Sequence, residues 1–189
     1  MYINQDYAKV QGAEVNLIWQ ASNLFRAFGN VSYQLAKGKS NSARESSLQI
    51  EQNGEVPLTT EQYLAWDRPW NINLGVVLTP DTTLKKHKGW MKNMQLYVSS
   101  SYQSGFRYTP MILEGYNELG RPEFNSDLNN YLEERGTPWF NTDVKLTKTF
   151  ARKAGKGITL SIEVRNALNN KNAQIINPVT GRAWEEGDD

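Results

Sequence analysis

Two neighbouring stretches of the chain alternate strictly between apolar and polar side chains, and this pattern is the strongest constraint on the fold. From Ile158 to Asn166, branched aliphatic residues stand at every second position and polar residues fill the positions between them. The stretch from Thr142 to Phe150 repeats the pattern. A period of two is the signature of a β-strand with one apolar face and one wet face. The basic, glycine-containing segment 151–157 predicts a turn, so the two stretches should form a long hairpin.

The same alternation recurs in four earlier stretches. The sequence therefore predicts an all-β chain, an antiparallel up-and-down meander of long strands. The six expected strands span residues 9–20, 24–37, 66–79, 90–104, 142–150 and 158–166. Ile18 and Phe28 are exceptions, because they are apolar residues on otherwise polar strand faces. Residues 38–65, 105–138 and 167–189 are polar and lack the alternation, which predicts long loops at one end of the strands.

Composition excludes several classes of protein. A chain of 189 residues suits a single domain, and its net charge of +1 gives no general attraction to nucleic acid. There is no cysteine, so neither a disulfide framework nor a thiolate metal site is available. No apolar run approaches the roughly 18–20 residues of a transmembrane helix. A hydropathy scan of this kind does not detect barrel strands, because every second residue of such a strand is polar.

Strand length and the placement of aromatic residues favour a transmembrane β-barrel. The expected strands run roughly 9–14 residues, whereas strands of globular proteins usually have about 5–6, and a tilted membrane strand needs about 9–11. Aromatic residues gather at both strand ends, as the two interfaces of a membrane barrel require. At the short-turn end they are Trp19, Phe25, Trp90 and Phe150, and toward the long loops they are Tyr33, Trp66, Trp70, Tyr102 and Trp139.

Six strands are too few to close a bacterial barrel, which starts at about eight. In lipid, an open sheet edge leaves backbone N–H and C=O groups without partners, and each such group costs several kcal/mol. We therefore expect the chain to form one arc of a larger barrel, with further strands on both sides.

Six short motifs along the chain occur in a familiar order and spacing. They are Lys9–Glu14, Phe28–Gln34, Trp66–Trp70, Phe106–Pro110, Asp143–Lys148 and Glu163–Asn169. In this order they resemble the C-terminal part of the β-barrel of TonB-dependent outer-membrane receptors, particularly the large receptors of Bacteroidetes-like bacteria. Trp70 departs from the pattern, since the family often has histidine there. The family's TonB box, plug domain, earlier strands and closing strand have no counterpart in these residues.

The resemblance implies a nutrient receptor in the outer membrane of a Gram-negative cell. Such a receptor takes up a scarce iron chelate, vitamin, glycan or peptide with energy supplied through TonB. The implied partners are outer-membrane lipid, the remainder of the barrel with its plug domain, and TonB, but not nucleic acid. A passive outer-membrane barrel or adhesin arc and a small soluble β-sheet binding protein remain as alternatives.

Two groups of residues are candidates for a functional site. Aromatic side chains of segment 105–138 can stack on a solute, and these are Tyr108, Tyr116, Phe124 and Tyr131. The polar faces of the last two strands carry charges of both signs, from Asp143, Lys145, Glu163 and Arg165. We interpret these four as a lumen-facing charge ladder on neighbouring strands. The alternative is a surface salt-bridge lattice on a soluble sheet, which contributes little to stability.

The sequence predicts no enzyme, no cofactor and no metal site. His87 is the only histidine and lies in a basic turn, whereas a general base or a metal site needs partners. The acidic residues of segment 105–138 lack the regular spacing of a calcium loop. Asp67 and Arg68 are adjacent, and we expect them to form an ion pair on the lumen wall rather than an acid–base pair.

Overall fold

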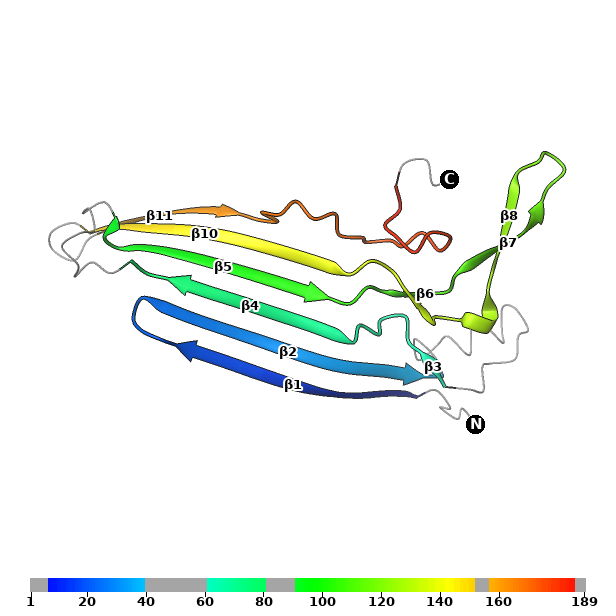
Figure 1. Cartoon of the computed structure of the whole chain (residues 1–189), viewed down its shortest axis with the longest axis horizontal. Coiled ribbons are helices and arrows are strands. Elements are labelled where there is room, and N and C mark those ends of the chain that lie inside the picture. The colour runs from blue at the N-terminus through cyan, green and yellow to red at the C-terminus, as the bar shows by residue number, and fades with distance from the viewer. Residues whose placement is uncertain (1–6, 40–60, 81–90, 152–156, 186–189) are drawn as a thin grey trace, which may run out of the picture.

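The computed structural model describes residues 7–39, 61–80, 91–151 and 157–185. In these residues the chain is all-β, and the predicted antiparallel up-and-down sheet is confirmed (Figure 1). Each long strand pairs with the next one along the sheet. The long strands are, in order, β1 (Ala8–Gln20), β2 (Phe25–Gly38), β4 (Trp70–Leu78), β5 (Met94–Gln103), β10 (Trp139–Ala151) and β11 (Gly157–Val164). The short strand β3 (Gln62–Tyr63) pairs with the end of β2.

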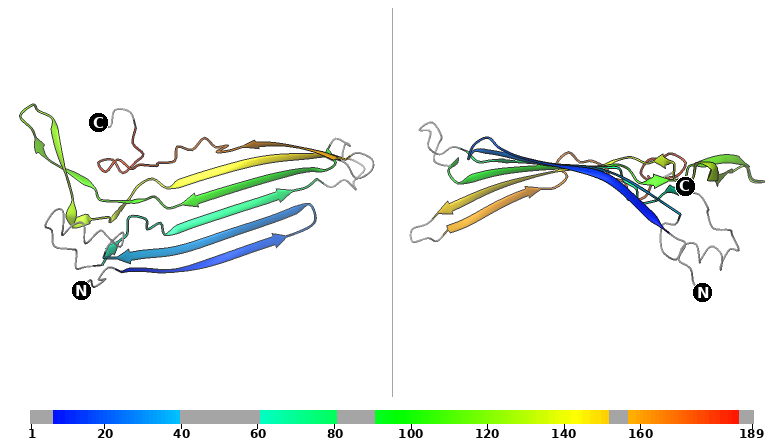
Figure 2. Two further views of the ribbon diagram at one scale, coloured as in Figure 1. Left: turned by 180° about the vertical axis from the view of Figure 1, so that it is seen from behind. Right: turned by 90° about the horizontal axis from the view of Figure 1, so that it is seen from below.

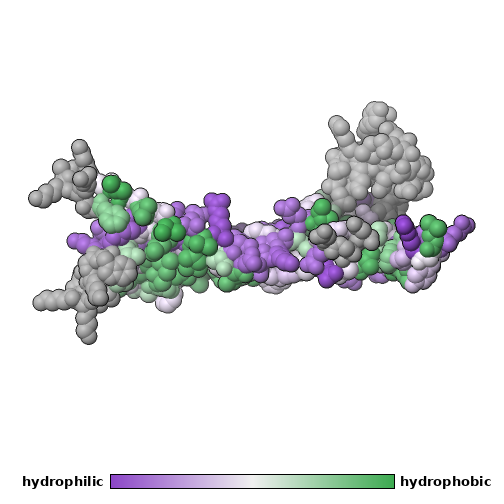
Figure 3. Space-filling model, turned by 90° about the horizontal axis from the view of Figure 1, so that it is seen from above, coloured by the Kyte–Doolittle hydropathy of each residue, from purple (hydrophilic) through white to green (hydrophobic). Residues whose placement is uncertain are grey.

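The register of the sheet places most apolar residues of the six long strands on one face. One row across the sheet consists of Trp19, Ala27, Val76, Val98, Val144 and Val164. A row on the opposite face consists of Asn16, Asn30, Asn73, Ser101 and Asn141. Seen edge-on, hydrophobic atoms gather along the lower side of the left half of the sheet, with hydrophilic atoms above them (Figure 3). The sheet therefore has one mainly apolar face and one mainly polar face.

The apolar face is not covered by another layer of the described structure. Leu17 is 67% exposed, Leu160 57% and Leu74 51%. The buried residues instead gather toward the ends of the strands that carry the long connections, where Ala36, Leu64 and Leu132 lie. The sheet thus lacks the two-layer core of a β-sandwich, in which apolar faces pack on each other.

The connections differ at the two ends of the sheet. The connections β1–β2, β4–β5 and β10–β11 join strands at one end of the sheet, and the longer connections β2–β4 and β5–β10 join strands at the other end (Figure 1). Figure 2 shows that the sheet is twisted, so that the axes of the two edge strands, β1 and β11, are inclined to each other. The alternation of connections agrees with the sequence-based prediction, although residues 81–90, with Trp90 and His87, lie outside the described residues.

The strand expected over 142–150 begins earlier, at Trp139, and three other boundaries differ from the prediction for local reasons. The strand expected over 66–79 begins only at Trp70, because Asp67 N–H donates to Leu64 C=O in a turn. The strand expected over 90–104 begins at Met94, since Asn93 has a positive φ of 59°. The strand expected over 158–166 ends at Val164, and Asn166 has a φ of 49°. Asparagine tolerates this left-handed conformation better than most residues.

Segment 105–138 is not the plain loop that its composition predicts. It contains β6 (Arg107–Tyr108), β7 (Met111–Tyr116), β8 (Pro122–Ser126), a short 3₁₀ turn (Leu128–Asn130) and β9 (Glu134–Arg135). The β7–β8 hairpin turn is held by the Asn117 side chain, which accepts from the backbone N–H groups of Leu119 and Arg121. These strands are too short and irregular for alternation to indicate them. No helix in the described part of the chain is long and apolar enough to span a bilayer.

Ile18 and Phe28, the two exceptions noted in the sequence, lie beside each other on the polar face. Ile18 and Phe28 are direct partners across β1 and β2. Phe28 also lies opposite Gly75 of β4 and stacks on Tyr97 of β5, with ring centroids 6.2 Å apart. A Cβ atom at position 75 would collide with the Phe28 ring, so glycine provides the space in which the ring lies. The polar face therefore carries one small apolar patch.

Candidate functional site

A strap of six residues, 64–69, connects β3 to β4 at the long-loop end of the sheet. Both ends of the strap are fixed to β2. Leu64 N–H donates to Ala36 C=O over 3.2 Å, and Pro69 C=O accepts from Gln34 N–H over 2.9 Å. Side chains of the strap are therefore held at defined positions relative to the sheet.

Asp67 is the fully buried acid of this strap. Its Oδ1 accepts from the Ala36 N–H over 2.8 Å. Its Oδ2 accepts from Arg107 Nε over 2.9 Å and from Arg135 over 3.1 Å. Arg107 also lies over the Tyr63 ring, 3.4 Å from the centroid. One carboxylate thus joins β2 and the strap to β6 and β9, which are pieces of segment 105–138.

The two guanidinium groups repel each other, and Asp67 offsets that repulsion. Burial lowers the pKa of Arg135, and the neighbouring Arg107 lowers it further, while Asp67 acts in the opposite direction. Arg107 additionally donates to the backbone carbonyls of Leu132 and Glu133. Buried charges need this combination of a counter-charge and hydrogen bonds.

The prediction that Asp67 forms an ion pair with Arg68 is wrong. Successive side chains of an extended segment point to opposite sides, and Asp67 pairs with Arg107 and Arg135 instead. These contacts join residues 40 and 68 positions apart in the chain. No local pattern in the sequence indicates such a pairing, so sequence reasoning missed it.

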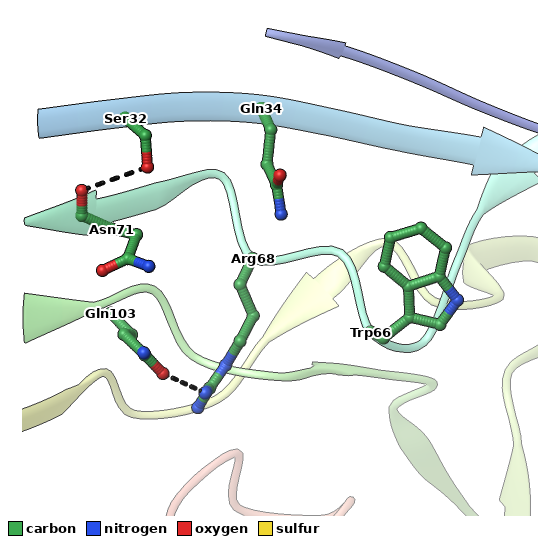
Figure 4. A pocket seen from close by; sticks show the side chains of 6 residues that line it. All are labelled: Ser32, Gln34, Trp66, Arg68, Asn71 and Gln103. Carbon is green, nitrogen blue, oxygen red and sulfur yellow. Dashed lines mark hydrogen bonds between the residues drawn. The ribbon is translucent and has the colours of Figure 1, made fainter. Parts of the chain in front are cut away.

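Arg68 lines a small depression of about 140 Å³ on the polar face of the sheet. The six lining residues are Ser32, Gln34, Trp66, Arg68, Asn71 and Gln103. Ser32, Asn71 and Gln103 belong to one row across β2, β4 and β5. Figure 4 shows Arg68 extending from the strap to Gln103, whose side-chain oxygen accepts its hydrogen bond. The wall is therefore made of amides, a hydroxyl, an indole ring and one cation.

The Arg68 guanidinium is only partly satisfied by its surroundings. It lies over the Phe106 ring, 3.8 Å from the centroid. Its Nε is buried and has no hydrogen-bond partner. Burial lowers the pKa of Arg68, because the charged form is removed from water. No acidic side chain in the described residues forms an ion pair with it, so the depression has an unmatched positive charge.

The four predicted aromatic candidates are not brought together into this depression. Tyr108 is in β6, Tyr116 ends β7, Phe124 is in β8 and Tyr131 follows the 3₁₀ turn. Tyr116 is 69% exposed, and Phe124 lies on the other strand of the same hairpin, opposite Leu113. Burial, together with Glu134, raises the pKa of Tyr108. None of the four lines the depression, and their role as substrate contacts stays a prediction.

The predicted charge ladder has the expected register on β10 and β11. Lys145 and Glu163 are direct partners, with Nζ and Oε2 3.9 Å apart. Arg165 Nε donates to Glu163 Oε1 over 2.8 Å. Asp143 accepts instead from the backbone N–H of Asn166 and holds the chain where it leaves β11. That these groups face a lumen stays a prediction.

Within the described ranges, no three His, Asp or Glu side chains gather as a metal ion would require. The single histidine, His87, lies outside these ranges. Comparison with protein-family models, with curated proteins and with solved structures finds no match to this chain.

Proposed function

We propose that the chain is one arc of an outer-membrane β-barrel, part of a TonB-dependent receptor that imports a scarce nutrient. The observation that carries this proposal is the sheet itself. Its long strands, its exposed apolar face and its polar opposite face match a membrane wall between lipid and a wet lumen. In a soluble protein, the exposed aliphatic band of β1 and β11 would be an aggregation liability.

The two exposed edges of the sheet support its being one part of a larger sheet. Every residue of β1 is exposed, and so is every residue of β11. β1 has 13 residues and β11 has eight, so each edge presents a row of free backbone groups long enough to pair with another strand. In the proposed receptor, further strands of the same polypeptide continue the sheet at both edges.

The arrangement of the connections supports the orientation of the arc. Short periplasmic turns and long extracellular loops distinguish the two ends of an outer-membrane barrel. The Asp67 contacts, the β7–β8 hairpin and the Arg68 depression all lie at the long-loop end, which would face the medium. The work of this arc is then to form the lipid-facing wall, to line the lumen and to present external loops to the solute.

The size and location of the native polypeptide test the proposal. An antibody raised against segment 105–138 is used to blot carbonate-washed outer membranes and the soluble fraction of the cells that carry the gene. We expect a band several times larger than 21.5 kDa in the outer membrane. A band near 21.5 kDa in the soluble fraction would contradict the proposal and leave a soluble β-sheet protein.

Coupling to TonB needs a separate test, because a passive barrel or an adhesin gives the same membrane band. Deletion of tonB should abolish uptake through a coupled receptor and leave passive diffusion unchanged. Screening of iron chelates, vitamins, glycans and peptides for growth that depends on both genes identifies the solute class. Growth that requires this gene but not tonB would indicate a passive outer-membrane barrel.

A further inference from the structure

The Arg68 depression has a charge that the described structure leaves unmatched. All six lining side chains are uncharged or cationic. The adjacent carboxylate, Asp67, is fully buried and already bound to Arg107 and Arg135. It cannot turn toward Arg68 without breaking that network. A partly buried cation in a low-dielectric wall is stabilised by an anion within hydrogen-bond distance.

The lining also supplies hydrogen-bond donors beside the cation. The side chains of Gln34, Asn71 and Gln103 carry amide N–H groups and line the depression together with Arg68. Arginine presents its N–H groups in a planar fork that matches a carboxylate. Because the space is only about 140 Å³, it takes one end of a solute rather than a whole large one.

Trp66 gives the depression its second chemical feature. Trp66 is 44% exposed, and it lies on the strap two residues before Arg68. Figure 4 shows the ring at one end of the depression, beyond the Arg68 side chain. A half-exposed aromatic ring beside polar groups offers a flat apolar surface to the ring of a solute. The combination selects a solute with an anionic group attached to a ring.

We propose that this depression binds the carboxylate of a ring-bearing organic acid, with Arg68 as the anion-binding residue and Trp66 as the contact for the ring. This inference rests on the proposed function for the source of the solute, which arrives from the medium at the long-loop end. The binding chemistry itself rests on the six lining residues. Arg68 holds the carboxylate through its guanidinium group, and Asn71 and Gln34 donate to the remaining oxygen positions.

The test measures binding of three probes to the full polypeptide, purified from outer membranes in detergent. Isothermal titration calorimetry at low salt compares galacturonate, galactose and inorganic phosphate. Galacturonate and galactose share a ring and differ by the carboxylate. We expect galacturonate to bind at least tenfold more tightly than either galactose or phosphate. Equal binding of the two sugars, binding of phosphate alone, or no binding of galacturonate would overturn the proposal.

Two variants connect the binding to this depression. Arg68→Gln removes the cation and should weaken galacturonate binding at least tenfold. Because Arg68 also packs on Phe106, a second variant, Asn71→Asp, keeps Arg68 and adds a negative charge to the wall. It should weaken binding to a similar extent. Gln95→Glu is the matched control, since it adds a negative charge to the same sheet face at the opposite end of β5 from Gln103 and should leave binding within about twofold. Unchanged binding in both Arg68→Gln and Asn71→Asp would overturn the assignment.

Failure of this inference and failure of the proposed function are distinguishable. If Arg68→Gln reaches the outer membrane and wild-type protein binds no galacturonate, only the ligand assignment is wrong. If the polypeptide is found in the soluble fraction, the receptor proposal is wrong, and the same titration on the soluble protein still decides whether the depression binds the carboxylate.

Discussion

At the scale of single residues, Asp67 does the most to organise the long-loop end. Its carboxylate is fully buried and accepts hydrogen bonds from one backbone amide and two guanidinium groups. Removing one partner from a buried charge network leaves the remaining charges without compensation. The network therefore depends on this one acid more than on either arginine.

Replacement of Asp67 by asparagine should destabilise the protein strongly. The amide keeps an acceptor for the Ala36 N–H, but it leaves Arg107 and Arg135 close together without a counter-charge. We expect a loss of about 3–5 kcal/mol in the free energy of unfolding, measured by urea unfolding of the full polypeptide in lipid vesicles. The control is Glu163→Gln, whose half-exposed ion pair with Lys145 should cost at most about 1 kcal/mol. Equal losses in the two variants would contradict the role of Asp67.

At the scale of strands, the sheet depends on one close approach between β2 and β4. The Phe28 ring lies in the space over Gly75 and reaches Tyr97 on the next strand. Any side chain at position 75 must displace the ring from that space. The apolar patch on the polar face is thus built by one glycine and two aromatic residues on three adjacent strands.

Gly75→Ala should separate Phe28 from Tyr97. The added methyl group takes the space of the ring, and we expect a loss of about 1–3 kcal/mol, as for other overpacked positions. The same urea titration measures the loss. Gly115→Ala is the control, since a Cβ there meets no atom within 4 Å. In the Phe28→Ala variant, Gly75→Ala should no longer lower the free energy of unfolding. A loss that persisted in this variant would show that the strain does not come from contact with the Phe28 ring.

Charge on the apolar face tests which side of the strands meets lipid. Val76 and Leu160 lie on that face, on a central strand and an edge strand. Arginine at either position should cost about 2–4 kcal/mol if it lies at the bilayer midplane. Ser161→Arg, one residue further and on the opposite face, should be tolerated. Heat-resistant mobility on a detergent gel reports insertion, and survival of both Val76→Arg and Leu160→Arg would show that the apolar face is not in lipid.

The sequence predicted the strands well because alternation is a local property. The positions of the six long strands and their common apolar face follow from a period of two in each stretch. Their ends did not follow, because Asn93 and Asn166 adopt left-handed conformations that composition does not indicate. The binding of Asp67 to Arg107 and Arg135 could not be predicted at all, since it depends on how segment 105–138 folds back onto the sheet. Arg68 was expected to pair with Asp67, and the depression was therefore missed.

At the scale of the whole molecule, the 189 residues should not form a stable soluble monomer by themselves. The apolar face and both strand edges are exposed, and such surfaces associate in water. We expect the purified chain to aggregate in detergent-free buffer, as measured by light scattering and size-exclusion chromatography. A monomer with a cooperative thermal transition would contradict the membrane proposal and favour the soluble alternative.

The even number of long strands has a consequence for how such a protein can change over generations. The first strand of the sheet starts at the same end at which the last strand finishes (Figure 1). A segment with this property can be gained, lost or duplicated inside a longer meander without reversing the direction of any strand that follows. In the proposed barrel, loops that face outward before the event would still face outward after it, so recombination at hairpin boundaries would resize the wall and preserve its sidedness.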